Sequence, residues 1–255
     1  MLTTFTSFRL ISADLGKSIA RTSSQPVVAR EIEHYNKAIG GIKSIDAFVK
    51  NDRVFKFAMK AFGLEDMDYA KAFIKKMLSE GVESRSSMAN RLSDKRYADF
   101  VKAFNFARYG ELTTTFAATR AGTVDRYVRQ TLEETAGAQN EGVRLALYFQ
   151  RKSPSVTSAF GLLADPALLK VAQTVLGLPV GQSSDVDATA KLIEQRMKIA
   201  DLKSPEKVQK LLQRFTAVWD ANTSPATGFA DQISGGVAGG GMSMDLLFSL
   251  QKLRR

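Results

Sequence analysis

The chain has 255 residues, of which 44% are hydrophobic, 24% are charged and none is cysteine. A chain of this length and composition buries a core of its own, which excludes a disordered protein, and the missing Cys excludes disulfides, thiolate metal sites and thiol nucleophiles. The net charge of +10 is uneven, because residues 1–110 hold 19 basic and 12 acidic side chains and the remainder hold 17 and 14.

The first predicted helix lies close to the N-terminus. Apolar residues recur there at spacings of three and four, in Phe8, Ile11, Leu15 and Ile19. They therefore share one face of a helix that ends near Ser23. Residues 1–12 are rich in Thr and Ser, which also suits a flexible targeting tail, but they lack the basic start and apolar run of a secretory signal. No stretch of the chain has the length and hydrophobicity of a transmembrane helix.

A second helix begins at Pro26 and ends at Gly40-Gly41, since Pro favours the first turn of a helix and Gly favours its stop. It contains His34, the only histidine of the chain. Histidine supplies most acid–base and triad chemistry, and a metal site needs a second ligand at suitable spacing. We therefore interpret His34 as a structural residue.

The middle of the chain contains an internal repeat. Residues 52–64, DRVFKFAMKAFGL, return as residues 165–179, DPALLKVAQTVLGLP. Looser matches join residues 74–77 to 193–197 and residues 93–104 to 204–215. The repeat predicts two related three-helix modules, at 42–110 and 153–221, which follow N-terminal helices at 1–41 and flank connecting helices at 111–152. The connecting helices are expected to be interrupted near Gly122 and Gly137.

Both copies of the repeat carry start and stop signals for a helix. Asp52 and Asp165 can each accept hydrogen bonds from free N–H groups of the first turn, and Pro166 suits the first helical position. Gly63 and Gly177 suit the left-handed residue of a Schellman stop, with the following Leu making its apolar contact.

The C-terminal end differs from the rest. Residues 222–241 are rich in Gly, Ser, Thr and Ala, which is typical of a flexible linker. Residues 242–255, MSMDLLFSLQKLRR, predict an amphipathic helix that is too short to be stable alone and must dock on its own body or on a partner. The residues that we predict to bind a partner are Leu246, Leu247, Phe248, Leu250 and Leu253.

No catalytic or phosphate-binding motif is complete in this sequence. The Gly cluster at 235–241 is not followed by Lys-Ser or Lys-Thr, and Ser204 to Lys207 fits a helix start better than a β-lactamase motif. We predict no catalytic residue, no cofactor and no metal. Residues 90–110 are basic and aromatic, which leaves nucleic-acid binding as an alternative. Their aromatic residues share one helical face, however, and this favours burial.

Four segments in order, AMKAFGLEDMDYAKAFIKKML, ANRLSDKRYADFVKAFNF, ALYFQRKSPSVTSAFGLLADPALL and PEKVQKLLQRFTAVWD, resemble an uncharacterised bacterial family, domain-of-unknown-function family 1217. The resemblance covers most of the chain from residue 3 to residue 219, and again the terminal helix. It implies a gene within a flagellar cluster of alphaproteobacteria, and it implies no enzyme activity and no catalytic residue.

The sequence thus predicts an all-α protein of two related helical modules, packed into one elongated or bundle-like body with flexible termini. We expect a non-enzymatic, protein-binding factor of flagellum assembly or structure, in the cytoplasm or associated with the flagellum. The alternative is a basic helical protein that binds nucleic acid, whose affinity would fall steeply with salt.

Overall fold

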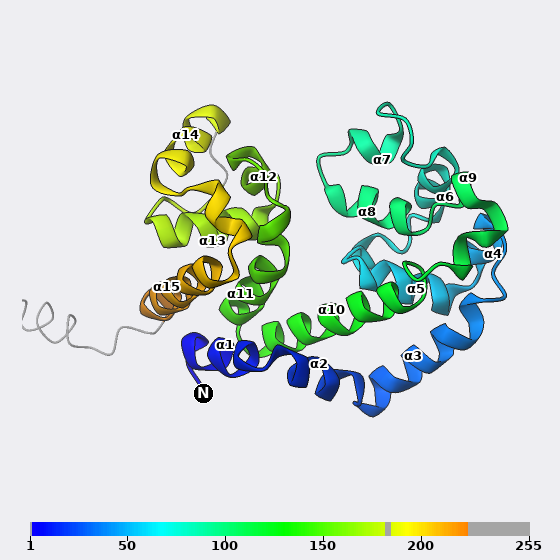
Figure 1. Cartoon of the computed structure of the whole chain (residues 1–255), viewed down its shortest axis with the longest axis horizontal. Helices are drawn as coiled ribbons and strands as arrows, with labels where there is room; N and C mark the ends of the chain where they lie inside the picture. Colours follow the sequence, from blue (N-terminus) through cyan, green and yellow to red (C-terminus); the bar gives the residue numbers. More distant parts are fainter. Residues whose placement is uncertain (1, 182–184, 224–255) are drawn as a thin grey trace, which may run out of the picture.

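Every regular element in residues 2–181 and 185–223, which the computed structural model describes, is helical (Figure 1). The all-α prediction is therefore confirmed. The first nine helices are α1 (Thr4–Ala13), α2 (Leu15–Ser23), α3 (Pro26–Ile39), α4 (Ile45–Lys50), α5 (Asp52–Ala61), α6 (Lys71–Glu80), α7 (Met88–Arg91), α8 (Lys95–Ala103) and α9 (Phe106–Tyr109). After the 3-10 turn η2 (Gly110–Thr115) come α10 (Ala121–Gln139), α11 (Glu141–Lys152), α12 (Ala159–Leu163), α13 (Pro166–Leu176), α14 (Val186–Arg196) and α15 (Pro205–Thr223).

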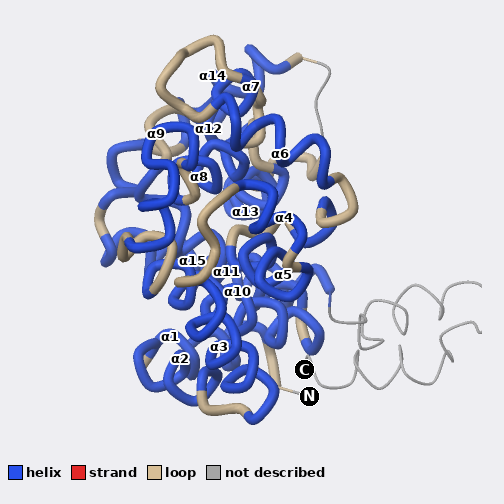
Figure 2. Tube along the Cα trace, turned by 90° about the vertical axis from the view of Figure 1, so that its right-hand side faces the viewer, coloured by secondary structure: helices blue, strands red, loops and turns tan. Residues whose placement is uncertain are grey.

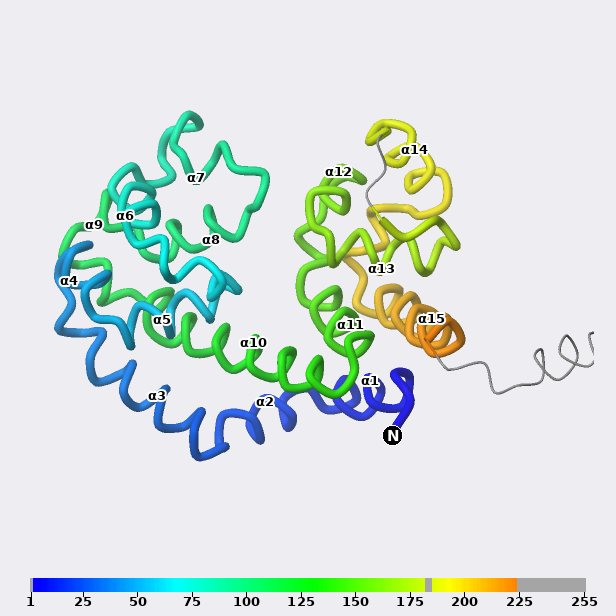
Figure 3. Tube along the Cα trace, turned by 180° about the vertical axis from the view of Figure 1, so that it is seen from behind, coloured from blue at the N-terminus to red at the C-terminus, as the bar shows by residue number. Residues whose placement is uncertain are grey.

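Two lobes stand on a base formed by α1, α2, α3 and α10 (Figures 1 and 3). Lobe 1 consists of α3 to α9 and the first half of α10, and its core is rich in Phe and Tyr. Lobe 2 consists of α1 and α11 to α15, and its core is mostly aliphatic. The side view shows the base helices below both lobes, with helix and loop but no strand along the described parts of the trace (Figure 2). The predicted N-terminal unit at 1–41 is thus shared, because Phe8 lies in the core of lobe 2 and Tyr35 in that of lobe 1.

The N-terminal segment is packed into the body. The single helix predicted up to Ser23 is two helices, because Asp14 leaves helical geometry (φ −140°, ψ 78°) and its side chain accepts a hydrogen bond from the backbone N–H of Lys17. Nor do Thr4–Ala13 form a free tail. Asp220 on α15 accepts hydrogen bonds from the backbone N–H groups of Thr4 and Phe5, at 2.8 and 3.0 Å. The start of α1 is therefore held against the end of α15.

The repeat is longer and better aligned than the sequence prediction. Residues 44–64 and 158–178 match without a gap in their caps and stops. Ser44 and Ser158 cap α4 and α12, and Asn51 and Asp165 cap α5 and α13. The predicted role of Asp52 as a cap was wrong, because Asn51 at the preceding position accepts the hydrogen bond and leaves Asp52 in the first turn. In each lobe the short helix packs on the two that follow it, α4 on α5 and α6, and α12 on α13 and α14.

The predicted Schellman stops are confirmed in both lobes. Gly63 and Gly177 have φ values of 69° and 64°, in the left-handed region that favours glycine. The N–H of Leu64 donates to the carbonyl of Met59, and that of Leu178 to the carbonyl of Gln173, both at 2.9 Å. Pro166 occupies the first turn of α13 as predicted.

The connecting helices are interrupted near Gly137 as predicted, but the break lies at Asn140, and α10 passes Gly137 itself unbroken. A Cβ at Gly137 would lie 2.6 Å from the Cδ of Arg144 on α11. The glycine therefore serves the close approach of two helices and does not end one. Gly122 likewise lies within α10, which starts one residue before it.

A buried carboxylate joins the lobes where α10 meets α11. Glu133, 1% exposed, accepts hydrogen bonds from Arg129 at 2.9 Å and from both Nε and Nη2 of Arg151 at 2.8 and 2.7 Å. Arg129 also donates to the carbonyl of Leu147. Because a buried charge is stable only when paired and hydrogen-bonded, this triad fixes α10 against α11.

Candidate interaction surface

The residues that the sequence predicted to bind a partner, Leu246, Leu247, Phe248, Leu250 and Leu253, lie outside the described residues, as does the predicted linker beyond Thr223. Among the described residues, no helix is long and apolar enough to cross a membrane. No group of three or more His, Cys, Asp or Glu side chains in the same ranges is placed to hold a metal ion. His34 is partly buried, and its Nε2 finds no hydrogen-bond partner among the residues that the structure describes.

The basic and aromatic stretch at 90–110 is mostly core and paired charge. Tyr97, Phe100 and Phe104 are buried in lobe 1, as their shared helical face predicted. Arg96, in contrast, is half-buried. It donates to Asp94 and to the carbonyl of Gly63, and the hydrogen bond to Asp94 raises the pKa of its guanidinium. Arg108 is exposed and paired with Glu83 at 3.1 Å.

Three exposed apolar side chains that the sequence analysis did not single out lie close together in the chain at the end of this stretch. Tyr109, Leu112 and Phe116 are 39%, 62% and 41% exposed. The rings of Tyr109 and Phe116 lie 4.8 Å apart between centroids, and the guanidinium of Arg108 lies 5.2 Å from the Tyr109 ring. We call these three residues the η2 platform, because Leu112 lies on η2 and the two rings flank it in the chain.

Buried hydroxyl groups hold the backbone of the η2 platform. Thr113, Thr114 and Thr119 are fully buried. Their hydroxyls donate to backbone carbonyls within the segment and, from Thr114, to the carbonyl of Ile42 at 2.9 Å. The hydroxyl of Tyr35 donates to the carbonyl of Thr119 at 2.5 Å, and burial raises the pKa of this phenol well above its usual range, which keeps it protonated. The exposed side chains are thus displayed on a fixed backbone.

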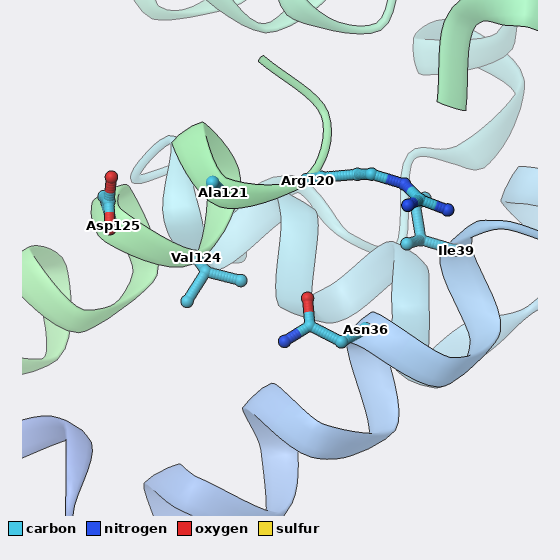
Figure 4. Close-up of a pocket in the computed structure, with 6 residues that line it drawn as sticks. All are labelled: Asn36, Ile39, Arg120, Ala121, Val124 and Asp125. Carbon is cyan, nitrogen blue, oxygen red and sulfur yellow. The ribbon is translucent and has the colours of Figure 1, made fainter. Parts of the chain in front are cut away.

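A pocket of about 410 Å³ lies beside the η2 platform, between α3 and the start of α10 (Figure 4). Its lining residues are Asn36, Ile39, Arg120, Ala121, Val124 and Asp125. The Nε of Arg120 donates to the carbonyl of Thr114 at 3.0 Å, so the pocket and the platform share a structural element. Within the described residues neither Arg120 nor Asp125 forms an ion pair.

The sequence did contain a signal for the platform. A run of three threonines between two aromatic residues is unusual for a helix, because β-branched side chains whose hydroxyls can bond to the backbone favour turns and irregular structure. The run indicates a loop held by its own side chains. Which side chains of such a loop stay exposed depends on the helices beneath it, and that information is not local.

Comparisons with known proteins give a family and a structure. The signature of the family described as protein of unknown function (DUF1217) matches residues 61–208. An X-ray crystal structure of a protein from Agrobacterium tumefaciens matches with a TM-score of 0.81 and 49% sequence identity, over 88% of this chain and 97% of that chain. No curated protein matches the sequence. The likeness therefore extends over most of both lobes.

Proposed function

The chain belongs to the DUF1217 family of proteins of unknown function, and from that premise we propose that it is a non-enzymatic factor that binds a protein partner through the η2 platform. The single observation that carries the proposal is the exposure of Tyr109, Leu112 and Phe116 on a backbone that buried threonines hold in place. Aromatic residues and Arg dominate the energetically important centres of protein interfaces.

A fixed backbone strengthens this argument. Ordering a loop or a side chain on binding costs free energy, and a surface that is already ordered avoids part of that cost. The platform also has Arg108 beside Tyr109, and its charge is already balanced by Glu83. An apolar surface with balanced charge suits an apolar patch on a protein better than it suits a polyphosphate.

The same features weigh against the nucleic-acid alternative. Base stacking needs exposed aromatic faces beside free cations that follow a phosphate backbone. Phe100 and Phe104 are fully buried, and Arg96 and Arg108 are paired with carboxylates. Residues 90–110 therefore offer few exposed rings or unpaired cations that could bind a nucleic acid.

We further propose that the partner is a component of the flagellum, because the family is expected in flagellar gene clusters. The predicted C-terminal helix is a second candidate contact, and Leu250→Asp is predicted to abolish that contact without unfolding the body. Both statements rest on the sequence and on the family resemblance.

The test is swimming motility, with electron microscopy of flagella, in a strain that lacks this gene. The strain is complemented with the natural chain, with Leu112→Asp, and with Phe160→Asp as a matched control, because Phe160 is 51% exposed on α12 of the other lobe. We expect filaments and swimming with the natural chain and the control, and loss of both with Leu112→Asp at equal protein level. Normal swimming of the deletion strain would overturn the flagellar proposal, and full rescue by Leu112→Asp would overturn the role of the platform.

A further inference from the structure

The pocket between α3 and α10 contains an arginine that is positioned but not neutralised. The Arg120 side chain extends over the C-terminal end of α3, near Ile39, and its Nε donates to the carbonyl of Thr114 (Figure 4). No carboxylate of the described residues pairs with it, and its two Nη groups make no hydrogen bond to protein there. A guanidinium held in this way presents free N–H donors to whatever enters the pocket.

Gly40 lies directly beside this guanidinium. Its backbone is ordinary right-handed helix (φ −64°), so its conformation does not call for glycine. A Cβ at residue 40 would, however, lie 2.8 Å from the Nη2 of Arg120, closer than van der Waals contact allows. The absent side chain therefore makes room for the guanidinium. An Ala at residue 40 would therefore displace the end of the exposed Arg120 side chain.

We infer that this pocket is a binding site for a carboxylate group, with Arg120 as the residue that recognises it. A planar guanidinium matches a carboxylate in a charge-assisted, bidentate hydrogen bond. The Asn36 side-chain amide adds a polar group to the lining between the two helices, and Ile39 and Val124 supply apolar walls for a short carbon chain. The carboxylate belongs either to a small acid or to a side chain or C-terminus of a protein partner.

Asp125 sets the selectivity of the site. Figure 4 shows its carboxylate at the opposite end of the pocket from the guanidinium of Arg120. A ligand whose carboxylate binds Arg120 and whose ammonium group faces Asp125 is attracted at both ends, whereas a second carboxylate near Asp125 is repelled. The site thus favours a zwitterion over a monoacid, and a monoacid over a diacid.

Three acids of equal chain length test this inference on the full chain: 4-aminobutyrate, butyrate and succinate. Each is titrated to tens of millimolar at constant ionic strength, with the ¹⁵N–¹H signals of the Arg120 Nε and the Asn36 amide as readout. We expect saturable shifts of both signals in the stated order of affinity, with Arg91 Nε, an exposed arginine on α7, unmoved. Shifts that do not saturate, or an affinity for succinate equal to that for 4-aminobutyrate, would overturn the inference.

Two variants and a matched control separate recognition from general charge. Arg120→Gln is expected to weaken binding of 4-aminobutyrate at least about tenfold, Gly40→Ala to weaken it by displacing the guanidinium, and Arg91→Gln to leave it unchanged. Equal affinity of Arg120→Gln and the natural chain would overturn the inference. If Arg120→Gln does not fold, Asp125→Asn tests it instead, because this exchange should abolish the preference for 4-aminobutyrate over butyrate.

The sources of the carboxylate are told apart by size. A blocked peptide that carries one Glu shifts the same two signals if a protein side chain can reach the pocket, and leaves them unmoved if only small acids enter. Leu112→Asp is expected to leave the affinity for 4-aminobutyrate unchanged, because Leu112 does not line the pocket.

Discussion

Lobe 1 and lobe 2 share an arrangement of helices and differ in the side chains that form their cores. The match of residues 44–64 to residues 158–178 keeps each cap and each stop in place. The side chains between these points are not conserved in kind. Lobe 1 packs stacked and edge-on rings around Phe48 and Phe100, whereas lobe 2 packs Leu, Val and Ala. Caps, stops and apolar periodicity thus specify the arrangement of helices, and many fillings of similar volume satisfy it.

The surfaces of the lobes differ as well, and one position accounts for much of the difference. Phe104, the residue that follows α8, and Phe215 on α15 are equivalent buried residues. Asn105 follows Phe104, and its side chain accepts a hydrogen bond from the backbone N–H of Arg108. This hydrogen bond caps α9, so a new helix starts at the next residue. Thr216 follows Phe215, and its hydroxyl donates back to the carbonyl of Leu212, so α15 continues to Thr223. In lobe 1 the chain therefore turns after α8 and forms the η2 platform. In lobe 2 the helix α15 continues and packs against α1.

The largest predicted effect breaks the link between the lobes. Glu133→Gln removes the carboxylate that pairs with two arginines in the buried junction. We expect the free energy of unfolding to fall by about 3–5 kcal/mol, because two buried charges lose their partner. Urea denaturation followed by circular dichroism measures it. Glu141→Gln serves as the control, since Glu141 is half exposed and its ion pairs should contribute under about 1 kcal/mol. Equal losses in the two variants would contradict the account of the junction.

A smaller effect separates the two cores. Phe104 has three ring partners, Phe48, Phe62 and Phe100, whereas Phe215 has one, Trp219. Phe104→Leu should cost about 2–3 kcal/mol and Phe215→Leu about 1–2 kcal/mol, because each aromatic pair stabilises the fold by about 0.5–1.5 kcal/mol beyond the area that it buries. Thermal unfolding of both variants by calorimetry gives the comparison. A larger loss at residue 215 would show that the ring cluster of lobe 1 is not the stronger core.

The smallest effect tests what the lobes share. Gly63→Ala and Gly177→Ala each force a Cβ into a left-handed residue, which costs about 1–2 kcal/mol. An added Cβ would meet nothing nearer than 3.7 Å at Gly63 and nothing within 4 Å at Gly177. The two losses, measured by urea denaturation, should therefore agree. Unequal losses would mean that the stops are not equivalent.

The sequence predicted those parts of the fold whose causes are local. The helix stops at Gly63 and Gly177, the proline start of α13 and the buried face of α8 follow from residue type and spacing. The break at Asp14 was missed because an apolar face that continues at helical spacing on both sides conceals a change of helix. The packing of α1 against α15 joins residues that are more than 200 positions apart.

The candidate sites were predicted less well than the fold, for a physical reason. Leu112 is of interest because no other side chain covers it, and Arg120 because no carboxylate of the described residues pairs with it. Both properties depend on how the whole lobe is assembled and cannot be derived from the local sequence. The threonine run beside them was visible, but its meaning depends on acceptors such as the carbonyl of Ile42, 72 residues away.

Photo-crosslinking in living cells tests most directly whether lobe 1 carries a binding surface that lobe 2 lacks. A photoreactive amino acid replaces Leu112 in one strain and Phe160 in another, since both side chains are more than half exposed. The account predicts a discrete crosslinked product with another protein from residue 112 and none from residue 160. No product from residue 112, or the same product from both positions, would contradict it.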